Sequence, residues 1–219
     1  MGRWIPLETP TGPITAWRAD PAIPAVGALV IVQEIFGVNS HIRGVVDKFA
    51  AHGYVAIAPA LFDHIERGVE LGYDKEGVAR GRELVEQLSF DRAVEAVRAA
   101  ADQVASSGRV GVVGYCWGGT VAFLSCARLG LPAVSYYGSR TVQFLHEHPS
   151  EPLLLHFGEQ DASIPPEAIR QHYDLLPEAE IHVWPAGHGF NCEQRADYNE
   201  SVANDALQRT LAFLGMHLK

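Results

Sequence analysis

A cysteine between two glycines is the residue of this sequence best suited to covalent chemistry. Cys116 stands in the stretch Gly-Tyr-Cys-Trp-Gly, directly after an apolar run at residues 110–113. A lone thiol after a strand is more often a packing residue. Glycines two residues before and after it, however, are typical of a sharp strand-to-helix turn, where larger side chains would collide with neighbouring backbone. The helix dipole beyond the turn would favour the thiolate, so the pattern predicts a nucleophile.

An acid and a histidine follow Cys116, in the chain order nucleophile, acid, histidine. Asp161 lies in the turn Gly-Glu-Gln-Asp and His188 in Ala-Gly-His-Gly-Phe, each after an apolar stretch typical of a strand. In such a triad the imidazole accepts the nucleophile's proton and the carboxylate orients the ring. Glu159 and Asp174 are rival acids, but the turn at the strand end favours Asp161. The sequence therefore predicts a triad of Cys116, Asp161 and His188.

The backbone near the nucleophile should stabilise the oxyanion of a tetrahedral intermediate. One predicted donor is the N–H of Trp117, the residue immediately after Cys116. The other is the N–H of Ile35, in Gln-Glu-Ile-Phe-Gly after the third predicted strand. Together with the triad, these donors would suit attack on an ester or lactone carbonyl.

The elements that must position these residues alternate between strands and helices. Two short pieces at 3–7 and 14–19 are predicted to form a leading hairpin, and residues 62–77 a polar loop. Alternation predicts an α/β fold, with a mostly parallel sheet covered by helices on both faces and a site at the carboxyl ends of its strands. The further predicted strands are 27–35, 54–61, 109–114, 132–138, 152–158 and 180–185; the helices are 41–53, 78–88, 90–105, one from 118, a short one near 141–148, 165–176 and 201–216.

Composition narrows the classes of partner. The chain has 219 residues, 47% hydrophobic and 20% charged, which fits a single α/β domain over 1–219. A formal net charge of −9 argues against nucleic acid and anionic membrane surfaces, so a small-molecule substrate is expected. The N-terminal residues lack the apolar core of a signal peptide, and the apolar run at 22–32 is too short to span a membrane. We therefore expect a cytoplasmic protein.

Cysteine and histidine spacing does not point to a metal or cofactor. The three cysteines, Cys116, Cys126 and Cys192, include no C-x-x-C pair and are too few for a disulfide framework. We therefore expect them to be free thiols. The ten histidines include no H-E-x-x-H motif. We predict that the protein uses neither a metal nor a cofactor.

Several motifs in this order resemble those of the dienelactone hydrolase family. They are QEIFGVNSHIRGVVDKFAAHGYVAIAPALF, VGVVGYCWGGTVAFL, VSYYG, FGEQD and AGHGF, spread over about residues 28 to 190. The resemblance implies the α/β-hydrolase fold without a lid domain. It also implies a monomeric, cofactor-free cysteine hydrolase that opens enol-lactone or related ester rings.

Cys116, Asp161 and His188 match the family's triad. Glu34 matches a glutamate that faces the nucleophile in the family, and a carboxylate close to a thiol disfavours the thiolate until substrate arrives. The alternative is that Glu34 caps the Gly-Val-Asn-Ser turn at the strand end. Tyr137 matches a tyrosine that lines the family's pocket, although a core tyrosine is nearly as well supported.

One departure from the family bears on the substrate. The family's arginine four residues after the catalytic histidine, which holds a substrate carboxylate, is replaced here by Cys192, and Arg195 lies three residues further. Arg80 and Arg82 lie near the family's other arginine. Because a thiol does not replace a bidentate guanidinium, we expect a less anionic lactone or ester.

Two other functions fit the sequence less well. The chain could be a binding or thiol-redox protein in which Cys116 and Cys192 form a switchable pair, since Cys192 lies four residues past His188. It could also be a general esterase for small esters, because the glycine-lined loops and the absence of a lid suit small substrates.

Overall fold

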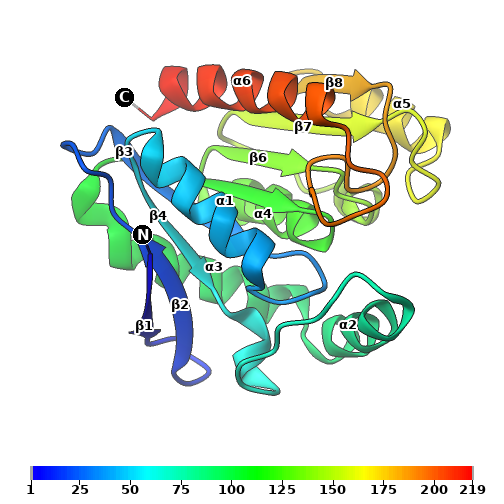
Figure 1. Ribbon diagram of the computed structural model, residues 1–219. Helices are drawn as coiled ribbons and strands as arrows, with labels where there is room; N and C mark the ends of the chain where they lie inside the picture. Colours follow the sequence, from blue (N-terminus) through cyan, green and yellow to red (C-terminus); the bar gives the residue numbers. More distant parts are fainter. Residues whose placement is uncertain (1, 219) are drawn as a thin grey trace. The chain divides into compact units, whose positions relative to one another are not determined.

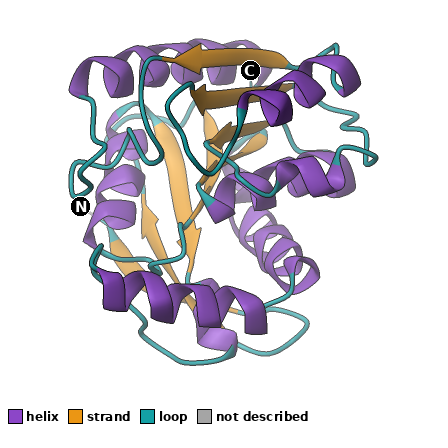
Figure 2. Ribbon diagram, turned by 90° about the vertical axis from the view of Figure 1, so that its right-hand side faces the viewer, coloured by secondary structure: helices purple, strands orange, loops and turns teal. Residues whose placement is uncertain are grey.

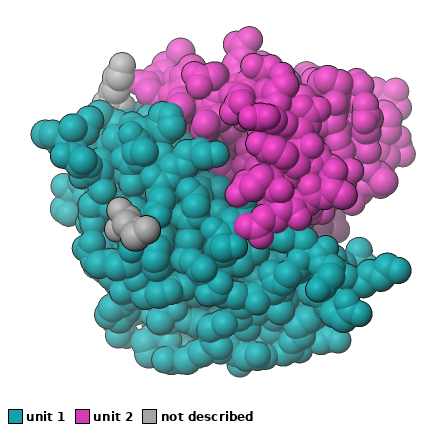
Figure 3. All heavy atoms as spheres, viewed as in Figure 1, with its two compact units in different colours: residues 1–111, 218–219 teal, residues 112–217 magenta. Residues whose placement is uncertain are grey.

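The computed structural model describes residues 2–218 and divides into two units (Figure 3). Unit 1 comprises residues 1–111 with 218–219, and unit 2 comprises residues 112–217. The single domain over residues 1–219 stays a prediction. No helix within residues 2–218 is long and apolar enough to cross a membrane.

Unit 1 begins with the predicted hairpin. Strands β1 (Arg3–Leu7) and β2 (Ile14–Ala19) pair antiparallel, and β2 pairs antiparallel with β4 (Tyr54–Pro59). Strand β3 (Gly27–Val32) lies parallel to β4. Residues 33–35, predicted to extend this strand, lie beyond its end, where the side-chain oxygen of Gln33 accepts the N–H of Leu61 instead.

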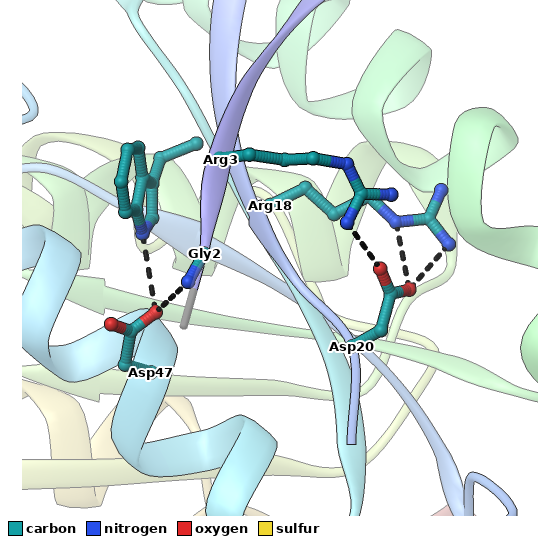
Figure 4. Close-up of polar contacts among 6 residues, drawn as sticks. Gly2, Arg3, Arg18, Asp20 and Asp47 are labelled. Carbon is teal, nitrogen blue, oxygen red and sulfur yellow. Dashed lines mark hydrogen bonds and ion pairs between the residues drawn. The ribbon is translucent and has the colours of Figure 1, made fainter. Parts of the chain in front are cut away.

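Polar contacts attach the hairpin to its surroundings (Figure 4). The carboxylate of Asp47 accepts the backbone N–H of Gly2 at 3.0 Å and the indole N–H of Trp17 at 3.3 Å. Asp20 forms ion pairs with Arg3 and Arg18. Such partly exposed pairs contribute little to stability, so the buried apolar side chains of β2 hold the hairpin in place.

The helices of unit 1 begin at capping side chains. Asn39, Asp74 and Ser89 accept backbone N–H groups in the first turns of α1 (Ser40–Ala51), α2 (Lys75–Gln87) and α3 (Phe90–Val104). Helix α2 starts three residues before the predicted 78 because Asp74 caps it. Figure 1 shows α1 in front of β3 and β4 and α3 behind them, and both helices contact these strands. The 3-10 turns η1 (Leu61–His64) and η2 (Ala105–Ser107) complete the unit.

Unit 2 holds the second half of the alternation, as predicted, except that the short helix predicted near 141–148 is a 3-10 turn, Thr141–Phe144. Its strands are parallel and pair in the order β5-β6-β7-β8. Strands β5, β6 and β7 are buried along their whole length, which is typical of a parallel sheet covered on both faces. The elements are β5 (Val110–Tyr115), α4 (Trp117–Leu129), β6 (Ala133–Tyr136), η3 (Thr141–Phe144), β7 (Leu153–Gly158), α5 (Pro166–Leu175), β8 (Glu180–Trp184) and α6 (Glu200–His217).

Helices lie on both faces of these strands (Figures 1 and 2). Phe157 of β7 packs against His172 of α5 at a ring distance of 4.8 Å. Its neighbour His156 points to the opposite face, where it bonds with Thr210 of α6. Helix α5 therefore covers one face of the strands and α6 the other.

Candidate active site

The turn between β5 and α4 holds Cys116 in an unusual backbone conformation. Its φ of 55° and ψ of −120° lie in a region that residues other than glycine rarely adopt. The N–H of Cys116 donates to the carbonyl of Tyr136 at 2.9 Å, and 9% of the residue is exposed. A strained backbone of this kind is expected where a turn must present a side chain for function.

Two glycines allow the close contacts of this turn. A Cβ at Gly114 would lie 1.9 Å from the carbonyl oxygen of Gly118, so the close approach predicted from the sequence is present. A Cβ at Gly119 would lie 2.7 Å from Oγ of Ser135 in β6. The sequence assigned no role to Gly119, but its position directly after Gly118 is the signal that could have indicated a close helix–strand contact.

Asp161 follows β7 and has a fully buried side chain. Its Oδ2 lies 2.6 Å from Nδ1 of His188, and its Oδ1 accepts the backbone N–H of Ser163 at 2.8 Å. Because both oxygens have donors, the carboxylate is fixed in orientation.

His188 joins the acid to the thiol. While Nδ1 donates to Asp161, Nε2 lies 3.1 Å from Sγ of Cys116. The structure thus brings together the three residues predicted to form a triad, each from the carboxyl end of a different strand. This arrangement is the one in which an imidazole exchanges a proton with a nucleophile.

The electrostatics of the trio favour an imidazolium. Burial lowers the pKa of His188, but its interactions with Cys116 and with the hydrogen-bonded carboxylate of Asp161 outweigh burial and raise this pKa from 6.5 to about 10. At neutral pH His188 therefore carries a proton that it could give to a leaving group.

Backbone bonds tie together the loops that carry Asp161 and His188. The N–H of Glu159 donates to the carbonyl of Trp184 at 2.8 Å, and the N–H of Gln160 to that of Ala186 at 3.0 Å. Gly158 makes the approach possible, because a Cβ there would lie 2.3 Å from the carbonyl oxygen of Ala186. The distance between acid and histidine is thus set by the backbone of both loops.

Charged side chains cover the glycines on either side of His188. A Cβ at Gly187 would lie 2.9 Å from the carboxylate of Asp197, and one at Gly189 would lie 2.5 Å from Nε of Arg195. The guanidinium of Arg195 therefore reaches the backbone next to His188. The sequence alone did not show whether Arg195 reaches inward.

Tyr137, predicted to contact substrate, packs against His188. It is fully buried, and its φ of 42° makes it the second strained non-glycine residue of the described chain. Its ring lies 5.1 Å from that of His188 and 5.2 Å from that of Phe190, both edge to face. Contact with substrate stays a prediction.

Glu34 and Ile35 lie in unit 1, just after β3. Glu34 is fully buried, and its Oε2 accepts the hydroxyl of Tyr73 at 3.1 Å, a partner that the sequence did not indicate. Asn39, rather than Glu34, caps α1. The carbonyl oxygen of Ile35 packs against Gly81 of α2. The roles of Glu34 toward the thiol and of Ile35 in an oxyanion hole stay predictions.

Arg80 and Arg82 lie on α2. The guanidinium of Arg80 pairs with the carboxylates of Glu66 and Glu83, and Arg82 is exposed. The ion pairs of Arg80 would have to break before it could bind a substrate carboxylate, so a substrate-binding role for either arginine stays a prediction.

The three cysteines are thiols in the structure. Cys192 is fully buried, and its N–H donates to the carbonyl of Gly189. Cys126 is fully buried in α4 as predicted for a core residue, and burial raises its pKa to about 12. A thiol of this kind stays protonated and unreactive at neutral pH.

Comparisons with known proteins agree with this geometry. A model described as "Dienelactone hydrolase family" matches residues 14–218. A carboxymethylenebutenolidase from Pseudomonas putida is 35% identical over 210 residues, which cover 89% of this chain and 88% of the relative. A solved structure from Klebsiella pneumoniae, assigned to the dienelactone hydrolases, is 29% identical with a TM-score of 0.85 and covers 97% of this chain and 98% of its own.

An esterase from Pyrococcus furiosus shares the fold alone, with a TM-score of 0.73 at 14% identity over 100% of this chain and 93% of its own. These similarities confirm the α/β-hydrolase fold predicted from the sequence.

Proposed function

Since this chain belongs to the dienelactone hydrolase family and is a carboxylic ester hydrolase, we propose that it opens small lactones or cleaves small esters through an acyl-enzyme at Cys116. The observation that carries the proposal is the pair of contacts at His188, with Sγ of Cys116 at 3.1 Å on one ring nitrogen and Asp161 at 2.6 Å on the other. This geometry supports nucleophilic catalysis by a thiolate.

In the first step, the sulfur of Cys116 attacks the carbonyl carbon of the substrate. A C–S bond forms and the carbonyl π electrons move to oxygen. Trp117 directly follows Cys116 and begins α4. Its N–H, next to the nucleophile, is the proposed donor to the developing oxyanion.

In the second step, the C–O bond to the leaving oxygen breaks. The imidazolium of His188 gives that oxygen the proton on Nε2, which the raised pKa keeps available at neutral pH. In a lactone the leaving oxygen remains tethered to the acyl group, so this step opens the ring and leaves a thioester on Cys116.

Hydrolysis of the thioester completes the cycle. His188, now neutral, accepts a proton from water while the water oxygen attacks the thioester carbon. Collapse of this second intermediate breaks the C–S bond and frees the acid. Asp161 holds the ring orientation throughout, because its Oδ2 keeps the hydrogen bond to Nδ1.

The substrate class follows from Cys192. A fully buried thiol occupies the position at which the family resemblance implies a carboxylate-binding arginine, and a thiol offers no bidentate donor. We expect neutral lactones and esters to be better substrates than carboxylated lactones. Arg195 argues against this expectation, because its guanidinium lies over Gly189 and could bind a substrate carboxylate.

A turnover panel tests the proposal. Wild type, Cys116→Ala and the matched control Cys126→Ala are assayed with carboxylated enol-lactones, neutral lactones and short aryl esters, and the acyl-enzyme is sought by mass spectrometry. Loss of at least about 10³-fold in Cys116→Ala, with activity kept in Cys126→Ala, is expected. Unchanged turnover in Cys116→Ala would contradict the mechanism. A preference for carboxylated lactones that disappears in Arg195→Gln would contradict the expected substrate class.

A further inference from the structure

A hydroxyl on α6 lies at the centre of a buried chain of hydrogen bonds that joins three strands. Oγ1 of Thr210 lies 2.7 Å from the hydroxyl of Tyr136 in β6 and 3.1 Å from Nε2 of His156 in β7. The indole N–H of Trp184 in β8 donates to Nδ1 of His156 at 3.1 Å. Tyr136, His156 and Thr210 are fully buried, so breaking any of these bonds leaves a polar group without water to replace its partner.

The chemistry of the indole fixes the direction of part of the chain. An indole nitrogen only donates, so Nδ1 of His156 accepts and the imidazole proton lies on Nε2, from which it is donated to Thr210. Burial, aided by the nearby His182, lowers the pKa of His156 to about 3, so the ring stays neutral. Thr210 therefore accepts a hydrogen bond from β7 and also bonds with the tyrosine of β6.

Each joined strand leads to one part of the triad. The carbonyl of Tyr136 accepts the N–H of Cys116 at 2.9 Å, and the ring of Tyr136 stacks at 4.8 Å on Tyr115, which directly precedes Cys116. Strand β7 ends at Gly158, three residues before Asp161, and β8 ends at Trp184, four residues before His188. The chain of bonds thus links the three strand ends at a level just below the catalytic side chains.

We propose that Thr210 is a positioning residue of the hydrolase, whose hydroxyl sets the relative positions of the ends of β6, β7 and β8 and thereby the spacing of Cys116, Asp161 and His188. The inference rests on the proposed function. Thr210 acts through geometry and touches no reacting atom. A displacement of about 1 Å among catalytic groups is enough to cost about 10²-fold in rate.

Two substitutions separate the hydroxyl from the volume of the side chain. Thr210→Val removes the hydroxyl at nearly constant volume, and Thr210→Ser keeps it. We expect Thr210→Val to lower kcat by about tenfold or more, with KM changed by less than about threefold, and Thr210→Ser to stay within about threefold of wild type. Ser125→Ala is the matched control, because Ser125 carries a buried hydroxyl that donates within α4, to the carbonyl of Val121.

A spectroscopic readout distinguishes positioning from mere support of α6. The proton between Nδ1 of His188 and Asp161 should give a far-downfield NMR resonance in wild type and Thr210→Ser. The resonance should shift or broaden in folded Thr210→Val. If Thr210→Val does not fold, Tyr136→Phe removes the bond to Thr210 from its other end while keeping the ring against Tyr115.

Full kcat and an unmoved resonance in the Thr210→Val or Tyr136→Phe protein would overturn the proposal, as would an equal loss in Ser125→Ala. Cys116→Ala, assayed with these variants, distinguishes a failure of the proposed function from a failure of the proposed role of Thr210. Turnover retained in Cys116→Ala contradicts the proposed function. Turnover lost in Cys116→Ala but complete in Thr210→Val contradicts only the role of Thr210.

Discussion

Nε2 of His188 lies 3.1 Å from Sγ of Cys116, although 72 residues separate the two in sequence. The contact joins a side chain on a strained strand-to-helix turn to one on a glycine-flanked loop. Because the imidazole is also bound to Asp161 on its other nitrogen, a change in either partner should alter the pKa of His188.

The first prediction concerns the thiol's effect on the imidazole. The pKa of His188 is raised, so the folded protein keeps the imidazolium at neutral pH and loses it as the pH rises through about 10. Cys116→Ala removes the largest contribution that raises this pKa, while burial continues to lower it, so the pKa should fall. An NMR titration of the imidazole Cε1–H in both proteins measures the change, and an equal pKa in the two would show that the thiol does not stabilise the imidazolium.

The second prediction concerns the acid. Asp161→Asn keeps the size of the side chain but removes its charge and presents an amide to Nδ1, which favours the wrong tautomer of His188. A fall in kcat/KM of about 10²- to 10⁴-fold is expected, together with a lower pKa of His188. Asp174→Asn, on the exposed side of α5, is the control. A comparable loss there, or none in Asp161→Asn, would speak against Asp161 as the acid.

The third prediction tests the nucleophile turn. Gly114→Ala places a Cβ 1.9 Å from the carbonyl oxygen of Gly118, and neither backbone segment has a flexible end that could move away. A loss of about 3 kcal/mol or more in the free energy of unfolding is expected by urea denaturation. The control is Gly215→Ala in α6, where the new Cβ meets no atom of the described residues within 4 Å apart from its chain neighbours and the adjoining helix backbone. This second substitution should instead stabilise the protein by about 0.5–1 kcal/mol.

The fourth prediction is a dependence of stability on acid. The pKa of His156 is lowered from 6.5 to about 3 in the folded protein. Between these two pH values the unfolded chain therefore binds a proton at His156 that the native state does not bind. This contribution to stability is complete above pH 6.5 and is lost as the pH falls toward 3, with a slope of at most about 1.4 kcal/mol per pH unit. His156→Gln should flatten the free energy of unfolding between pH 6.5 and 4. A slope unchanged by the substitution would show that His156 protonates freely in the native state.

The sequence alone was enough to predict the order of strands and helices, because each element depends on local apolar periodicity and on turn residues close by in the chain. The hairpin, the parallel strands and the turn at Cys116 all lie where these patterns indicated. The predicted strand at 27–35 was too long, since apolar character continues past the point at which Gln33 turns to bond with Leu61.

The contacts around the site were decided by tertiary structure, since they join residues remote in sequence and depend on which face of a strand each side chain occupies. The sequence predicted the identity of the trio, but only packing shows that Tyr137 lies against His188 and that Tyr73 bonds with Glu34. Thr210 carries no local signal at all, because a threonine within a helix is ordinary. Only the folding of α6 over β6 and β7 brings its hydroxyl between Tyr136 and His156.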